Sequence, residues 1–238
     1  MIDFNTKILV PKCAEFGLEL STEATERLEA YGNLLLLWNE KFNLTAITEP
    51  EEVLYKHFYD CLLFFSAVKV ETGARVIDVG AGAGFPSLVL KIARPDINIT
   101  MLDSLNKRVA FLEEALCALS LNGNAVHARA EDAGQDPQMR EKFDISCARA
   151  VGGLNVLSEL CVPFVKPGGL FVAMKGGEAE NEVAAAKGAF KTLGMGEAEI
   201  IRRKLRENEN RSFITAKKIS QTPPKYPRNP AKIKKAAL

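Results

Sequence analysis

The chain has no long hydrophobic run and no stretch typical of a secretory signal. Its apolar run Leu34–Trp38 is far shorter than the roughly 20 residues that a membrane-spanning helix needs. Residues Met1–Phe4 lack the basic segment followed by an apolar one that an export signal shows. We therefore expect neither a membrane span nor export.

Cysteine and histidine are also scarce, with five and two residues in a chain of 238. The cysteines are scattered singly and odd in number, which excludes the paired spacing of a zinc site and does not suggest a disulfide framework. We expect no bound metal and a reduced, cytoplasmic compartment. The histidines lie beside apolar residues and are predicted to be packed or hydrogen-bonded rather than catalytic. These residues are Cys13, Cys61, Cys117, Cys147, Cys161, His57 and His127.

The formal net charge of +1 conceals a strong asymmetry. From Arg202 to Leu238 there are 12 basic residues against two acidic ones, and the rest of the chain is net acidic. A basic C-terminal end favours a polyanionic partner, although a solvated tail would have the same composition. The segment Pro223–Pro230 mixes rigid turns with an aromatic ring and cations, which suits nucleic acid. The candidate RNA contacts are Lys225, Tyr226, Arg228, Lys232, Lys234 and Lys235.

A glycine-rich segment points to a cofactor. The β-branched run Arg75–Val79 predicts a buried strand, and it leads into three alternating glycines, Gly80, Gly82 and Gly84. A dinucleotide fingerprint would need its third glycine one position later, where Phe85 stands.

Two carboxylates narrow the choice of cofactor. Asp78 would repel a pyrophosphate but suits a cationic amine and sulfonium, and Asp103 ends a second apolar run where it can accept bonds from ribose hydroxyls. S-adenosylmethionine fits this set. A generic strand-to-helix turn with solvated carboxylates is the alternative.

The order of predicted elements favours an α/β fold. Helices are expected at 22–40, 50–68, 105–119 and 178–193. Strands are expected at 75–79, 97–102, 125–128, 143–148 and 170–175, followed by a hairpin of 197–203 and 212–219. Alternating strands and helices predict a parallel sheet covered on both faces. With its terminal hairpin, this sheet resembles that of class I, Rossmann-like S-adenosylmethionine-dependent methyltransferases. We expect an N-terminal helical cap (residues 1–70), a methyltransferase core (71–221) and a basic tail (222–238).

The candidate acceptor site lies at the end of the fourth strand. Segment Ser146–Val151 lacks the Asn or Asp followed by Pro-Pro-aromatic that is typical of amine methylation. Cys147 could serve as a thiolate for attack through a ring carbon, but a cysteine in an apolar strand is usually buried. A ring nitrogen such as N7 of guanine needs no general base. Arg149 could pair with the cofactor's carboxylate, a substrate phosphate or an internal Asp.

Several segments resemble the ribosomal RNA small subunit methyltransferase G family, also called glucose-inhibited division protein B. They are Trp38–Thr45, His57–Asp60, Asp78–Pro86, Asp103–Arg108, Arg149–Val151, Lys175-Gly176 and Lys225–Arg228. Members of this family use S-adenosylmethionine to methylate N7 of a guanine in the 530 loop of bacterial 16S rRNA, at rRNA position 527. The resemblance implies this activity, with a partly assembled small subunit as substrate and a monomeric enzyme.

The resemblance also assigns roles to residues. Gly80 and Phe85 would line the methionine and adenosine pocket together with Asp78, Gly82 and Gly84. Asp103 and Ser104 would contact the ribose, Ala130 and Glu131 the adenine, and catalytic Arg149 the cofactor or the reacting base.

The chain departs from the family at two places, and other functions stay open. Ser87 stands where the family often has glycine, and Asn229-Pro230 replaces a glycine-containing tail. The alternatives are a small-molecule or different RNA methyltransferase of the same fold, or a non-catalytic RNA-binding protein.

Overall fold

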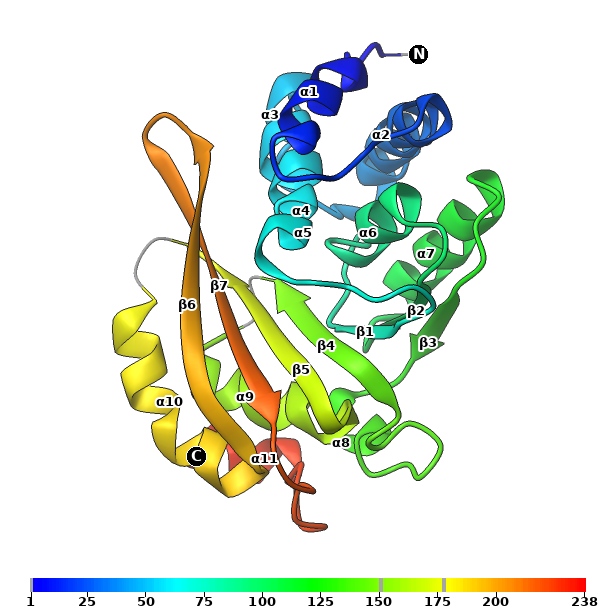
Figure 1. Cartoon of the computed structure of the whole chain (residues 1–238). Coiled ribbons are helices and arrows are strands. Elements are labelled where there is room, and N and C mark those ends of the chain that lie inside the picture. The colour runs from blue at the N-terminus through cyan, green and yellow to red at the C-terminus, as the bar shows by residue number, and fades with distance from the viewer. Residues whose placement is uncertain (1, 150–151, 177–178) are drawn as a thin grey trace.

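The computed structural model describes residues 2–149, 152–176 and 179–238. A single seven-stranded sheet crosses the molecule in the order β3-β2-β1-β4-β5-β7-β6 (Figure 1). The strands are β1 (Arg75–Val79), β2 (Asn98–Asp103), β3 (Asn124–His127), β4 (Phe143–Arg149), β5 (Val165–Lys175), β6 (Met195–Arg206) and β7 (Glu209–Lys218). The first five run parallel, and β7 and β6 add an antiparallel hairpin beyond β5. Because β1 lies between β2 and β4, the strand order reverses beside β1, where ligands of such sheets bind.

Helices cover both faces of this sheet. On one face lie α6 (Ser87–Ala93) and α7 (Asn106–Ala118), and on the other α8 (Ala130–Ala133), α9 (Leu154–Cys161) and α10 (Glu180–Leu193), with a short 3-10 turn η3 (Val162–Phe164). The alternation of side chains along β1 divides the core accordingly. Val76 packs in the core under α6 and α7, whereas Ile77 and Val79 pack in the core under α9 and α10.

The N-terminal helices share the first of these cores. They are η1 (Thr6–Ile8), α1 (Leu9–Ala14), α2 (Thr22–Phe42), α3 (Pro50–Val53), the π-helical turn η2 (Leu54–Tyr59), α4 (Asp60–Leu62) and α5 (Phe64–Ala67). Ser21 caps α2, since its Oγ accepts a hydrogen bond from the Ala24 amide at 3.1 Å. Leu28 and Leu35 of α2 are fully buried in the same cluster as Leu88 of α6 and Leu112 of α7.

The β6–β7 hairpin is longer than the strand it pairs with. The last residue of β5, Lys175, lies opposite Ser212, but pairing between β6 and β7 continues to Arg206 and Glu209. The end of the hairpin therefore projects past the carboxyl end of β5, toward the N-terminal helices (Figure 1). Contacts of Arg206 with Glu52 and of Arg203 with Ser66 hold it there.

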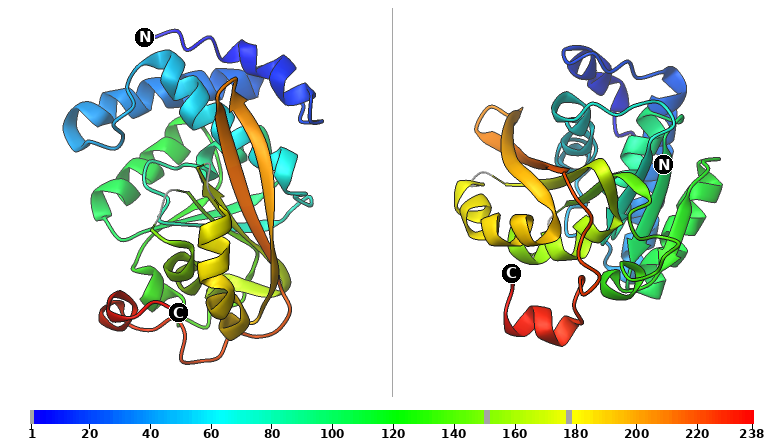
Figure 2. Two further views of the ribbon diagram at one scale, coloured as in Figure 1. Left: turned by 90° about the vertical axis from the view of Figure 1, so that its left-hand side faces the viewer. Right: turned by 60° about the horizontal axis from the view of Figure 1, so that its bottom comes forward.

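The C-terminal segment folds back on the molecule and ends in α11 (Pro230–Lys235). Arg140 donates hydrogen bonds to the carbonyls of Thr222 and Tyr226, and Thr222 Oγ1 donates to the Leu193 carbonyl. Figure 2 places α11 at the end of the molecule opposite the N-terminal helices. No helix in the described ranges combines the length and apolar character that crossing a bilayer requires.

The predicted strands are confirmed, with different ends. β1 has the expected bounds, β5 begins five residues early and the hairpin strands extend toward their turn. The helix expected at 50–68 is divided into α3, η2, α4 and α5. The expected start of α10 at Glu178 lies outside the described residues.

Candidate functional site

The loop after β1 has the conformation that its glycines predict. Gly80, Gly82 and Gly84 all have positive φ angles, of 77°, 59° and 89°. A Cβ at Gly84 would also lie 2.8 Å from Leu88 Cγ, so a side chain there is disfavoured both by the backbone angle and by this contact. The amide of Gly80 bonds to the Leu102 carbonyl at 2.8 Å, which holds the loop over the ends of β1 and β2.

Asp78 is buried beneath this loop. One of its carboxylate oxygens accepts hydrogen bonds, and the other has no partner within the described chain. Its Oδ2 accepts bonds from Ser87 Oγ at 2.6 Å and the Ser87 amide at 3.2 Å, so the family departure at Ser87 supplies a partner here. Its Oδ1 is buried and has no partner within the described chain. Burial raises the pKa of Asp78 from 3.8 to about 6. A buried, unpaired carboxylate oxygen fits a ligand that carries an ammonium group.

Asp103 ties the glycine loop to the end of β2. Its Oδ2 accepts a bond from the Gly82 amide and its Oδ1 one from the Leu105 amide, both at 2.9 Å. Arg108 Nη1 lies 3.4 Å from Oδ2. A carboxylate can accept about four bonds, so Asp103 retains some capacity for a ligand hydroxyl.

A cavity of about 280 Å³ collects many of the predicted cofactor residues. Its lining includes Asp103 at the end of β2 and the following Ser104, Ala130 and Glu131 of α8, and Gly80 of the glycine loop. Glu131 faces Arg129 across 3.7 Å. The structure brings these residues together, whereas Arg149 lies outside the lining of this cavity, and the part of the ligand that each residue contacts stays a prediction.

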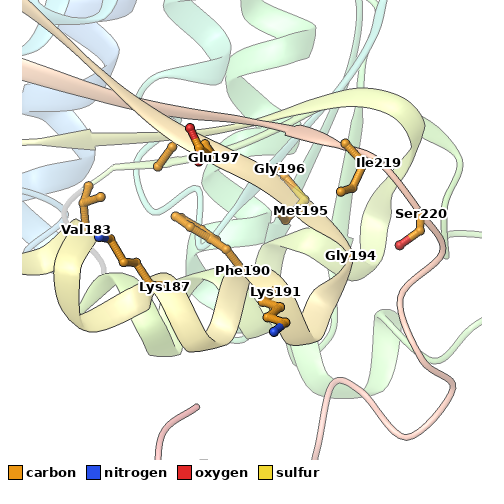
Figure 3. A pocket seen from close by; sticks show the side chains of 11 residues that line it. Val183, Lys187, Phe190, Lys191, Gly194, Met195, Gly196, Glu197, Ile219 and Ser220 are labelled. Atoms are coloured by element: carbon orange, nitrogen blue, oxygen red, sulfur yellow. The ribbon is translucent and has the colours of Figure 1, made fainter.

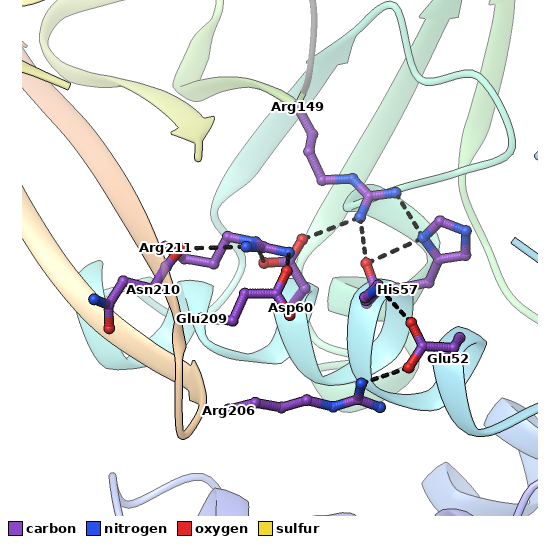
Figure 4. A network of polar contacts seen from close by, with 9 residues as sticks. Glu52, His57, Asp60, Arg149, Arg206, Glu209, Asn210 and Arg211 are labelled. Atoms are coloured by element: carbon purple, nitrogen blue, oxygen red, sulfur yellow. Dashed lines mark hydrogen bonds and ion pairs between the residues drawn. The ribbon is translucent and has the colours of Figure 1, made fainter. Parts of the chain in front are cut away.

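Arg149 is held by the N-terminal helices (Figure 4). Its Nη1 donates to the Lys56 carbonyl at 3.0 Å and to Asp60 Oδ2 at 3.1 Å, and its Nη2 lies 3.2 Å from His57 Nδ1. Its guanidinium also lies over the Phe85 ring, 4.8 Å from the centroid. The predicted partners of Arg149 were the cofactor's carboxylate, a substrate phosphate or an internal Asp. The structure shows the contact with an internal Asp, Asp60. The motif that Arg149 begins continues into Ala150 and Val151, outside the described residues.

His57 is a neutral member of this network. Its Nε2 lies 2.8 Å from Thr45 Oγ1, and its Nδ1 lies 3.1 Å from the Lys56 carbonyl oxygen and 3.2 Å from Arg149 Nη2, so both ring nitrogens are engaged. Burial, reinforced by the nearby Arg149 charge, lowers the pKa of His57 to about 3. The ring stacks on Phe85 at 4.3 Å between centroids. His57 is thus packed and hydrogen-bonded, as predicted.

A second cavity of about 430 Å³ opens beside this network. It is lined by Ile47, Lys56, His57, Asp60, Arg149, Met174, Lys175, Gly176 and Arg211. Phe85 belongs to the glycine loop and stacks on His57, which lines this second cavity. Four segments noted for their resemblance, containing Thr45, His57, Phe85 and Arg149, therefore meet in one place.

Two residues of the network had no predicted role. Asp60 stands in a noted segment, His57–Asp60, so its position was signalled without its function. Arg211 carries no sequence motif, and its Nε lies 2.8 Å from Asp60 Oδ1. Cys147 is fully buried, which raises the pKa of its thiol well above the usual value and disfavours a thiolate nucleophile.

The predicted RNA contacts divide into exposed and internal residues. Lys225, Lys232, Lys234 and Lys235 are exposed. Tyr226 is only 6% exposed, and Arg228 bonds Glu159 through Nε at 2.8 Å and Nη2 at 2.5 Å. In this conformation the Tyr226 ring has no accessible face for stacking on a base, and the Arg228 guanidinium is engaged within the protein.

A larger cavity, of about 670 Å³, lies away from these residues between α10 and β6 (Figure 3). Its walls include Phe190, Met195 and Ile219, with Lys187 and Glu197. It contains none of the predicted site residues. Across the described residues, no cluster of three or more His, Cys, Asp or Glu side chains could hold a metal ion.

The sheet order and the site at its strand ends define the fold of a class I methyltransferase. Solved structures share this fold at low sequence identity. An S-adenosylmethionine-dependent O-methyltransferase from Thermotoga maritima aligns with a TM-score of 0.52 and 17% identity, over 79% of this chain and 72% of its own. A predicted O-methyltransferase from Agrobacterium tumefaciens aligns with a TM-score of 0.52 and 21% identity, over 65% and 78%.

Sequence relatives are more specific. A family model described as rRNA small subunit methyltransferase G matches residues 24–212. Ribosomal RNA small subunit methyltransferase G of Bacillus subtilis (strain 168) is 49% identical over 228 residues, 94% of this chain and 95% of the relative. The protein of the same name from Clostridium botulinum (strain Loch Maree / Type A3) is 42% identical over 233 residues, 97% and 98%. The chain belongs to the rRNA small subunit methyltransferase G family and is a methyltransferase.

Proposed function

We propose that this protein transfers a methyl group from S-adenosylmethionine to N7 of a guanine in the 530 loop of 16S rRNA. Its substrate is a small-subunit particle, and it acts in the cytoplasm as a monomer. The observation that carries the proposal is the unpaired, buried Oδ1 of Asp78, whose carboxylate feels the charge of Arg149. The Arg149 guanidinium in turn has two N–H groups without a partner in the described chain. A carboxylate and a guanidinium suit the ammonium and carboxylate of an amino acid, which this cofactor carries.

The remaining cofactor contacts follow from the first cavity. Asp103 and Ser104 would hold the ribose, and Ala130 and Glu131 would hold the adenine, with Gly80, Gly82, Gly84 and Phe85 shaping the wall between. When bound, the cofactor supplies an electrophilic methyl group on a sulfonium. The chain's part is to orient the donor and the acceptor, since methyl transfer is an in-line displacement that depends on alignment.

The second cavity supports a ring nitrogen as acceptor. A hydroxyl or amine acceptor would need a general base, but both ring nitrogens of His57 are engaged and its pKa is lowered to about 3. Asp60 is occupied by two arginines. N7 of guanine has a free lone pair at neutral pH, so it can attack without a base from the protein.

The proposed organisation assigns a role to each part of the chain. Residues 1–70 form a cap, 71–221 the catalytic core, and the 222–238 segment contacts rRNA through Lys225, Lys232, Lys234 and Lys235. Tyr226 and Arg228 would support this segment from inside the protein. Exposed lysines on α11 suit phosphate contacts that weaken with salt.

Mass mapping of 16S rRNA from a deletion strain tests the reaction. The 7-methylguanosine of the 530 loop should be lost on deletion and restored by the full-length chain, but not by Arg149→Ala. An unchanged 7-methylguanosine level in the deletion strain would contradict the proposed reaction.

Assays in vitro test the substrate. Purified protein should methylate small subunits from the deletion strain in preference to a panel of small-molecule acceptors. The reverse preference would favour the small-molecule alternative. Calorimetry without S-adenosylmethionine binding would favour a non-catalytic RNA-binding protein.

A further inference from the structure

Asp60 lies between two arginines that come from different strands. Arg149 at the end of β4 contacts Oδ2 at 3.1 Å, and Arg211 of β7 contacts Oδ1 at 2.8 Å (Figure 4). The Asp60 side chain is 5% exposed, and those of Arg149 and Arg211 are 16% and 19% exposed. Oδ2 is therefore hydrogen-bonded to Arg149, whereas Oδ1 is ion-paired with Arg211 without hydrogen-bond geometry, in a largely buried setting.

Arg211 reaches Asp60 only because the hairpin projects beyond β5. Ser212 is the last β7 residue opposite β5, so Arg211 is the first residue of the projecting part. The contact joins the sheet's antiparallel edge to the helix that carries His57. Glu209 also contacts Arg211 at 2.9 Å, but its side chain is 32% exposed, so solvent screens its charge.

The contacts of Arg149 leave one side of its guanidinium without a partner. Both Nη1 hydrogens are directed to Lys56 and Asp60, and one Nη2 hydrogen to His57. The Nε hydrogen and the second Nη2 hydrogen have no partner in the described chain. These two lie on one edge of the planar group, the arrangement that binds a carboxylate through two parallel bonds.

We propose that Arg211 is a positioning residue that acts through Asp60 on Arg149. By ion pairing with the far oxygen of Asp60, it restricts the rotation of that carboxylate and keeps the Nε–Nη2 edge of Arg149 available to the carboxylate of the methyl donor. The choice of this anion rests on the proposed function. Burial raises the pKa of Asp60 and the two arginines oppose it, so Arg211 also helps to keep Asp60 ionised.

A double-mutant cycle on the full-length protein tests this role. S-adenosylmethionine affinity is measured by calorimetry for wild type, Arg211→Gln, Arg149→Gln and the double variant. Arg211→Gln should weaken binding about tenfold, within the usual range for coupled neighbours, and should have no further effect when Arg149 is already Gln. Additive losses would overturn the proposal, because they would mean that Arg211 acts independently of Arg149.

Two further variants separate positioning from folding. Arg206→Gln is the matched control, because Arg206 joins the same hairpin to the same helical segment through Glu52. It should leave donor affinity within about twofold of wild type, and a loss equal to that of Arg211→Gln would overturn the proposal. Arg211→Lys keeps the charge and should recover part of the affinity; no recovery in a folded variant would count against the role.

A crystal structure of Arg211→Gln, or of Arg211→Met if the first does not fold, gives a readout that needs no donor. The Arg149 guanidinium should move away from His57 or rotate so that its Nε–Nη2 edge points elsewhere. An unmoved Arg149 would overturn the proposal. If the wild type failed to bind S-adenosylmethionine, the proposed function would fail, and the position of Arg149 would still decide the role of Arg211.

Discussion

Asp78 shows how one buried residue can serve binding at the expense of stability. Its Oδ1 has no partner within the described chain, and burial raises its pKa from 3.8 to about 6. Folding therefore takes up a proton between these pH values, and stability falls as pH rises through this window. Above pH 6 the buried, ionised carboxylate destabilises the folded protein when no donor is bound.

We predict that Asp78→Asn stabilises the donor-free protein at pH 7.5 by on the order of 1 kcal/mol, because the buried charge is removed. The gain should shrink as pH falls below 6, while S-adenosylmethionine binding at pH 7.5 weakens more than tenfold through loss of a charged partner. Urea unfolding at several pH values and calorimetry measure the two effects. A less stable variant at pH 7.5 would contradict the assigned sign.

The glycines of the loop should differ in their tolerance of a methyl group. In Gly82→Ala the new Cβ would have no close contact, so the variant should lose only about 1–2 kcal/mol of stability from the positive φ angle. Gly84→Ala adds a clash with Leu88 and should cost a further ~1–3 kcal/mol. Thermal unfolding of both variants provides the comparison. Equal losses would mean that Leu88 moves aside without cost.

At the scale of elements, α2 supports the glycine loop from outside the sheet. Tyr31 donates a hydrogen bond to the Ala83 carbonyl, and its ring lies 5.4 Å from that of Phe85 and 5.6 Å from that of Phe58. Tyr31 is fully buried. The N-terminal helices thus help to shape the candidate cofactor site, and the packing continues across the proposed boundary at residue 70.

We predict that Tyr31→Phe destabilises the protein by about 1–2 kcal/mol, since the buried Ala83 carbonyl loses its donor. Donor affinity should fall by a smaller factor than in Asp78→Asn, because Tyr31 acts on the loop and not on the ligand. Chemical denaturation and calorimetry test the two parts. Unchanged stability would show that the hydrogen bond contributes little.

Local patterns predicted the elements better than their contacts. The run 75–79 is β-branched and buried, so its strand was predicted to the residue. The π-helical turn at Leu54–Tyr59 was missed, because apolar spacing over 50–68 fits a continuous helix and carries no mark of the different hydrogen-bonding pattern. Asp78, Asp103 and Arg149 could be found from their positions at strand ends. Arg211 could not, because its meeting with Asp60 depends on how far the hairpin projects.

At the scale of the whole molecule, part of the C-terminal positive charge is engaged in contacts within the protein. Lys218 is fully buried and bonds Glu141 at 2.7 Å, and Arg228 neutralises Glu159, which has no exposed surface. Arg206 and Arg211 pair with acidic residues near the N-terminal helices. The composition of the segment therefore overstates the positive charge available to RNA. The count of charges could be read from the sequence, but their partners lie 69 or more positions away.

We predict that Arg228→Ala destabilises the protein by about 3–5 kcal/mol, because it leaves Glu159 buried and unpaired. Replacing Lys232, Lys234 and Lys235 by Ala should leave stability unchanged and weaken rRNA association mainly at low salt. Thermal unfolding and filter binding across a salt series distinguish the two. A deletion after Thr222 would mix both effects. If the triple lysine variant bound rRNA like wild type, α11 would not be a contact.

The bare oxygen of Asp78 also bears on turnover. The ammonium group that it suits is common to the methyl donor and to the spent product left after transfer. The contact with this group is the same for both compounds, so we expect spent product to compete with fresh donor for the site. Sustained catalysis would then depend on removal of S-adenosylhomocysteine by other enzymes, and the protein would respond to the ratio of the two compounds in the cell.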